Sequence, residues 1–294
     1  WTQIITANTP GSIIGNPGVG EHAMAYDVIG NATVLFGGEL FQGIVPSPNV
    51  TLEYDGNDWV QVTTATAPER RSQNAMCSAP TLGGVLMFGG TNFNNPPGPN
   101  GEILWGDTWV YSASNDTWTQ LSPANSPAPR AGASLSYDAN RQVYVLHGGY
   151  IEDPAQPGFN LPISETWELD AAGTTWTDVT GSMGNPTAPR VRFEMSEGPG
   201  GCPVLFGGAD SFFGLGYSDT WSYGYCAASF PFGDGCSGSN GVPTLSAAVR
   251  PILGTTYSLD VTNLENSAVV AFIATGFSNT TSALGPLPFN LSVV

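Results

Sequence analysis

Apolar and polar residues alternate in short runs along the first three quarters of the chain. Four of these runs begin with tryptophan and have the period of two that is typical of a half-buried β-strand. They start at Trp1, Trp59, Trp118 and Trp176, which are separated by 58, 59 and 58 residues. Such a constant spacing predicts a repeated structural unit.

Three further patterns recur in step with the tryptophans and complete the unit. An apolar run predicts a buried strand that ends in two glycines, which can turn sharply at positive φ. The pairs are Gly37-Gly38, Gly89-Gly90, Gly148-Gly149 and Gly207-Gly208. An acidic residue, threonine and tryptophan open a third strand at 107–109, 165–167 and 219–221, and residues 50–54 are a weaker first copy.

The remaining strand precedes the apolar run and carries Met24, Met76, Leu135 and Met195 at matching places. In three units a proline and an arginine introduce it, at 68–71, 129–130 and 189–190. Each unit is therefore expected to contain four antiparallel strands. This pattern resembles the kelch repeat over about residues 1–225, and the resemblance implies an all-β fold with four blades of a β-propeller.

The ends of the repeat region complement each other. The fourth unit stops near residue 225 before any Trp-Thr-Gln strand, whereas Trp1–Ile4 is such a strand without a unit. We therefore expect the N-terminal strand to complete the last blade, because this would cover an open sheet edge. In the alternative, the same strand completes the blade of a neighbouring molecule, and a head-to-tail exchange of this kind generates a ring or a fibre.

Residues 226–294 contain no tryptophan and begin with a segment rich in glycine and serine. Runs at 244–249, 256–264, 268–275 and 289–294 predict strands, and a small C-terminal β-sandwich-like domain fits them. The order of its Gly, Pro and Cys positions is similar to a short β-domain that follows propeller repeats in secreted bacterial proteins. The resemblance implies no activity for this domain.

Composition excludes several classes of partner. The chain has 24 acidic residues, 7 arginines and no lysine, which gives a net charge of −17. Such a charge disfavours nucleic acid and anionic membranes, and no apolar run approaches the ~20 residues of a membrane span. Because the chain opens at Trp1 and few residues are charged, we expect a secreted protein, outside the cell or on its surface, whose signal peptide was removed.

Four cysteines are consistent with disulfides in a secreted protein. Cys226 and Cys236 are the favoured pair, while the pairing of Cys77 and Cys202 stays open. Five N-x-S/T sequons are candidate glycosylation sites. Their asparagines are Asn31, Asn49, Asn115, Asn279 and Asn290.

The sequence contains no convincing catalytic or cofactor motif, and we predict no catalytic residues, no metal ligands and no cofactor. The two histidines, His22 and His147, are too far apart for a helical zinc motif. His147 stands where other repeats have phenylalanine, which predicts a packed core position. Kelch-type propellers include copper radical oxidases, but no tyrosine–cysteine constellation in this sequence supports an oxidase.

Long insertions follow the glycine pairs, and equivalent positions in equivalent blades place them on one face. They carry aromatic residues that can stack on sugars or anchor a protein contact. The candidate partner-face residues are Phe41, Phe93, Trp105, Phe159, Phe212 and Phe213. The alternative is that these rings fold inward and pin the loops.

These observations favour a non-enzymatic structural or interaction protein. Its expected partner is a further copy of itself, in a homo-oligomer, an extracellular fibre or a surface layer. The alternative is a lectin-like propeller that binds extracellular glycans through the aromatic loop face.

Overall fold

The computed structural model describes residues 2–14, 19–40, 45–46, 49–92, 102–182, 187–198, 201–211 and 214–224, and four short strands between 244 and 286. The chain divides into two compact units, Trp1–Cys226 and Ala227–Val294.

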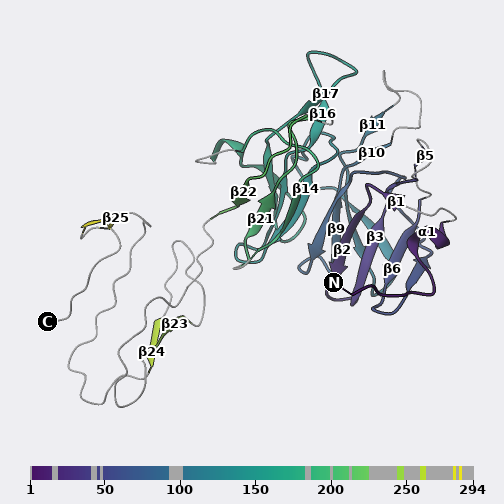
Figure 1. Cartoon of the computed structure of the whole chain (residues 1–294), viewed down its shortest axis with the longest axis horizontal. Coiled ribbons are helices and arrows are strands. Elements are labelled where there is room, and N and C mark those ends of the chain that lie inside the picture. Colours follow the sequence, from purple (N-terminus) through teal and green to yellow (C-terminus); the bar gives the residue numbers. More distant parts are fainter. Residues whose placement is uncertain are drawn as a thin grey trace. The chain divides into compact units, whose positions relative to one another are not determined.

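The first unit consists of antiparallel sheets that form the four blades of a β-propeller (Figure 1). The first blade contains β2 (Ala23–Asp27), β3 (Ala32–Phe36), β6 (Thr51–Tyr54) and β7 (Trp59–Val62). The second contains β8 (Ala75–Ala79), β9 (Gly84–Phe88), β12 (Thr108–Ser112) and β13 (Thr117–Leu121). The third contains β14 (Ser134–Asp138), β15 (Val143–His147), β18 (Thr166–Leu169) and β19 (Trp176–Asp178), and the fourth β20 (Glu194–Glu197), β21 (Pro203–Phe206) and β22 (Thr220–Ser222). The first strands of successive blades pack beside one another, in the order β2, β8, β14 and β20.

The repeated tryptophans of the fourth-strand pattern join neighbouring blades. The ring of Phe36 in the first blade meets Trp118 of the second edge-on, at 5.0 Å between centroids. The indole Nε1 of Trp118 also donates a hydrogen bond of 2.8 Å to the Thr51 hydroxyl. Phe88 and Trp176 repeat this packing between the second and third blades. The constant tryptophan spacing therefore reflects one contact that recurs from blade to blade.

The glycine pairs mark a close approach between blades, as the first pair illustrates. Gly37 and Gly38 have φ angles of 76° and 105°. A Cβ on Gly37 would lie 2.3 Å from the carbonyl oxygen of Arg71 in the next blade. The amide of Gly38 donates a hydrogen bond of 2.9 Å to that same oxygen. Glycine is required here both by conformation and by space.

The insertions after the glycine pairs form short hairpins at one end of the propeller. The hairpins contain β4 (Glu39–Leu40) with β5 (Val45–Pro46), β10 (Thr91–Asn92) with β11 (Ile103–Leu104), and β16 (Tyr150–Glu152) with β17 (Asn160–Pro162). In addition, β1 (Val19–Gly20) pairs with β4. We call this end of the first unit the loop face. The turn between β2 and β3 lies at the opposite end, because these strands are antiparallel.

The N-terminal segment does not follow the sequence-based expectation. Residues 2–9 form no strand, and the fourth sheet has three described strands. The amide and side-chain nitrogens of Asn8 instead donate hydrogen bonds of 2.8 Å to the Asp58 carboxylate in the first blade. The chain then enters the short helix α1 (Pro10–Ile13), which Thr9 caps. These local bonds hold the segment against the first blade, so the prediction that it completes the fourth is wrong for the described residues.

The second unit contributes two described strand pairs. Strand β23 (Thr244–Ala247) pairs antiparallel with β24 (Leu259–Thr262), and β25 (Thr281–Ser282) with β26 (Gly285–Pro286). The β-sandwich stays a prediction.

In the first unit, a single-turn 3₁₀ helix, η1 (Thr180–Ser182), is the one helical element after α1 among the described residues.

The predicted disulfide pair, Cys226 and Cys236, lies outside the described residues. Cys77 is a free thiol in the core of the first unit. Burial raises the pKa of this thiol far above its usual range, so it is an inert core side chain.

Candidate binding site on the propeller axis

Buried arginines hold together the strand ends beneath the loop face. Arg71 is fully buried, and its guanidinium donates to the Asp107 carboxylate (Nη2–Oδ2, 2.9 Å) and to the carbonyl of Gly89 (2.9 Å). The indole of Trp109 donates to the same carboxylate. Burial alone would raise the pKa of Asp107, but the hydrogen bonds and charge of Arg71 lower it. One buried ion pair thus joins the first three strands of the second blade.

The same arrangement recurs in the third and fourth blades, where Arg130 pairs with Glu165 and Arg190 with Asp219. It explains why proline–arginine and acidic–Thr–Trp patterns repeat together in the sequence. In the first blade, Val19 and Val50 occupy the corresponding positions. Two apolar residues therefore stand in the first blade where the other blades have the charged pair.

Two of the loop aromatics cover these arginines. The Trp105 ring lies 5.0 Å from the Arg71 guanidinium, and the Tyr217 ring lies 4.6 Å from that of Arg190. Of the predicted partner-face residues, Phe159 is exposed, whereas Trp105 packs against the arginine. Phe41, Phe93, Phe212 and Phe213 lie outside the described residues. Among the described candidates, an aromatic sugar contact would thus depend on Phe159.

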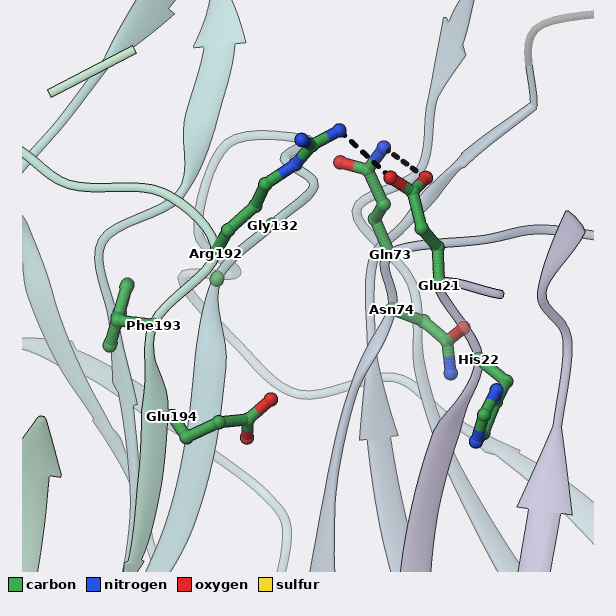
Figure 2. Close-up of a pocket in the computed structure, with 9 residues that line it drawn as sticks. Glu21, His22, Gln73, Asn74, Gly132, Arg192, Phe193 and Glu194 are labelled. Atoms are coloured by element: carbon green, nitrogen blue, oxygen red, sulfur yellow. Dashed lines mark hydrogen bonds and ion pairs between the residues drawn. The ribbon is translucent and has the colours of Figure 1, made fainter. Parts of the chain in front are cut away.

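Four equivalent residues, one from each blade, surround the propeller axis on the loop face. All have left-handed φ angles, which are 54° for Glu21, 53° for Gln73, 64° for Gly132 and 56° for Arg192. The amides of Gln73, Gly132 and Arg192 each donate to the carbonyl of the preceding member, at 2.9, 3.0 and 3.3 Å. The Arg192 side chain bonds Glu21 at 2.8 Å and links the fourth blade to the first (Figure 2).

These residues line a cavity of about 260 Å³. The other wall residues come from the positions that follow them in each blade. They are His22, Asn74, Ala133, Phe193 and Glu194. Figure 2 shows the Glu194 carboxylate directed into the space between the blades, away from the Glu21 cluster.

The cavity wall contains buried polar atoms without a hydrogen-bond partner. They are His22 Nδ1, Gln73 Oε1, and both Oδ1 and Nδ2 of Asn74. Asn74 is only 6% exposed. Unpaired buried polar atoms cost free energy, and native proteins usually satisfy them with protein, water or a ligand. Their concentration in one cavity makes this cavity the candidate binding site.

Burial also shifts the protonation of the wall residues. Desolvation lowers the pKa of His22 and raises the pKa of Glu194. His22 is thus neutral at pH 7. Glu194 is nevertheless exposed to solvent, so water solvates its carboxylate in the free protein, and a bound cation would compensate its charge.

More carboxylates lie around the cavity on the loop face. Glu39 accepts a hydrogen bond of 2.8 Å from Ser72, and its pKa is raised chiefly by burial. Glu102 accepts hydrogen bonds from Thr91, Tyr150 and Asn160. The surroundings of the cavity are therefore acidic.

Residues 15–225 match the KLHDC2/KLHL20/DRC7 Kelch-repeats domain family. The match spans all four blades. This chain belongs to the kelch-repeat family. The family resemblance of the repeats is therefore confirmed, together with the all-β four-bladed architecture. The axial cavity lies at the centre of the kelch propeller's loop face.

His147 is a core residue, as its place in the repeat suggests. It is 3% exposed, and its ring nitrogens bond the hydroxyls of Thr166 and Thr187, each at 2.8 Å. Burial and two nearby arginines lower its pKa to about 4. No group of three or more His, Cys, Asp or Glu side chains in the described part of the kelch propeller could hold a metal ion.

Three of the sequon asparagines are exposed, namely Asn31, Asn49 and Asn115. Asn279 and Asn290 lie outside the described residues. None of the described helices is both long and apolar enough to cross a membrane.

None of the charged wall residues of the cavity was predicted from the sequence. A signal was nevertheless present in the repeat register. Gln73, Gly132 and Arg192 each stand two positions after one of the three buried arginines, and Glu21 stands two positions after Val19. Superposing the units would have placed all four around the axis, although it would not have revealed which polar atoms lack partners.

Proposed function

We propose that this kelch propeller is a non-catalytic, extracellular binding protein whose partner docks on the loop face. The observation that carries the proposal is the axial cavity with its buried, unpartnered Asn74, Gln73 and His22 atoms. Kelch repeats generally mediate protein interactions, which supports a protein partner. The low content of charged residues supports a location outside the cell.

The proposal is tested by selecting binders from a phage-displayed library of random peptides on the whole chain. The loop-face variants Phe159→Ser and Gln73→Ala should each lower the affinity for the selected peptides at least about fivefold. This is the effect of a residue that contributes roughly 1 kcal/mol to binding. Ile29→Ser is the matched control, because Ile29 is 55% exposed in the turn at the opposite end. Peptides that respond to Ile29→Ser and not to the loop-face variants would contradict the proposal.

Self-assembly into a fibre or layer is a second candidate, which we propose on a different observation. Strand β22 pairs with β21 alone among the described strands. Phe206 on β21 is 59% exposed, and Met24 and Tyr26 on β2 are 48% and 46% exposed. An uncovered strand edge and exposed apolar side chains both favour association with another chain.

A further inference from the structure

We infer that the axial cavity binds the guanidinium group of an arginine side chain on the partner. This inference rests on the proposed function, since it assigns a chemistry to the centre of the same loop face. It follows from the charge of the cavity, its hydrogen-bonding atoms and its size.

The charge of the cavity wall is negative. Arg192 pairs with Glu21 at 2.8 Å, so these two charges compensate each other. Glu194 is the remaining charged wall residue, and no hydrogen bond or ion pair joins its carboxylate to another of the described residues. The corresponding positions in the other blades are Ala23, Ala75 and Ser134. A carboxylate on an exposed residue thus stands at one of four equivalent places where the other blades have a small side chain.

The free hydrogen-bonding atoms are mostly acceptors. Gln73 Nε2 donates to the Glu21 carboxylate at 2.8 Å, and since a carboxylate only accepts, Oε1 must be the free atom. Asn74 Oδ1 is a second buried acceptor without a partner, and the exposed Glu194 carboxylate supplies two further oxygens. The free donor among these side chains is Asn74 Nδ2. A ligand that suits this wall therefore needs several donors and a positive charge.

Guanidinium fits these requirements better than ammonium. It presents five N–H donors in a planar fork and is more weakly hydrated, whereas an ammonium has three donors around a single point. Phe193 also lines the cavity, but its ring is buried and packs edge-on against His147, so the preference for guanidinium rests on the hydrogen-bonding atoms. The volume of about 260 Å³ suits one side chain, being smaller than the roughly 300–1,000 Å³ of pockets for drug-sized ligands.

The field around the cavity favours the same ligand. Glu39 and Glu102 lie near its mouth, and the chain carries a net charge of −17. Such a field attracts a cationic partner and repels an anionic one.

The test uses the full chain and three blocked peptides, acetyl-Gly-Arg-Gly-amide and its citrulline and lysine counterparts. Citrulline keeps the shape of arginine and removes its charge. Calorimetric or NMR titration should show the arginine peptide binding at least about tenfold more tightly than the citrulline peptide, with the lysine peptide between them. The preference should weaken with added salt.

Glu194→Gln is expected to remove most of the preference for arginine over citrulline. Glu197→Gln is the matched control, because it removes the same charge from the same strand, outside the cavity wall. Glu194→Ala provides a second variant whose side chain already occurs at Ala23 and Ala75. It should unfold at no lower temperature than the original chain, so lost binding cannot be attributed to unfolding.

Equal binding of the arginine and citrulline peptides would overturn the inference, as would a preference that survives Glu194→Gln. Tighter binding of spermidine than of the arginine peptide would assign the cavity to a free polyamine and overturn it as well. If library peptides respond to loop-face variants but carry no basic residue, this inference fails while the proposed function stands. If arginine binds but no peptide responds to the loop-face variants, the proposed function fails instead.

Discussion

At the scale of single residues, the kelch propeller places a titratable side chain where other repeats have phenylalanine. His147 takes the place of Phe36 and Phe88, whose rings meet a tryptophan of the next blade. It lies edge-on to Phe193 instead, at 5.6 Å, and bonds two threonines. The imidazole is stable there only in its neutral form, because burial disfavours its protonation.

This position predicts a pH-dependent stability. His147 has a pKa of about 4 in the folded protein and about 6.5 when unfolded. As the pH falls from 6.5 to 4, the unfolded chain takes up the proton first, so this residue lowers the free energy of unfolding by up to about 3 kcal/mol. Above pH 6.5 it causes no such loss.

His147→Phe should remove this component, which urea denaturation at pH 7 and pH 4.5 can measure. The variant should lose less stability between the two pH values than the original chain does. It should also be less stable at pH 7, by about 1–2 kcal/mol, because the Thr166 and Thr187 hydroxyls lose their partner. An identical pH dependence in both proteins would show that His147 does not titrate as described.

At the scale of elements, the blade depends on a buried ion pair that connects its first three strands. Asp107→Asn should therefore leave the fully buried Arg71 without a compensating charge. The expected loss is about 3–5 kcal/mol, the usual effect of removing one partner of a buried pair. Chemical denaturation measures this change.

The first blade supplies the control for this prediction. Replacing both residues, Arg71→Val with Asp107→Val, reproduces the Val19 and Val50 pair that the first blade already has. The double variant should be less destabilised than Asp107→Asn, because no buried charge is left unpaired. If Asp107→Asn lowers the free energy of unfolding by less than about 1 kcal/mol, the ion pair does not stabilise the blade as proposed.

At the scale of the whole molecule, uncovered apolar side chains at Met24, Tyr26 and Phe206 predict association between chains. Static light scattering at rising concentration should give masses above the 30.6 kDa of one chain, and electron microscopy should show fibres or layers. Phe206→Asp should suppress both, because a charge on β21, beside the open β22 edge, opposes apolar contact with another chain. Ile29→Asp is the control at the turn between β2 and β3, and a chain that stays monomeric throughout would contradict the prediction.

The repeat, the four blades and the core position of His147 could all be predicted from the amino-acid sequence. These features follow from local patterning, since alternating strands and glycine pairs recur at a fixed spacing. The sequence misplaced the N-terminal segment, because its strand-like alternation does not encode the bonds from Asn8 to Asp58.

The candidate site could be located only in the three-dimensional structure. Glu21, Asn74 and Glu194 lie far apart in the sequence and line one cavity because different blades contribute residues around the same axis. Whether a polar atom is paired depends on neighbours from other blades, and no local pattern specifies these. The sequence could therefore indicate which strands form, whereas the packing of the blades determined that a buried amide and a carboxylate face one cavity without partners.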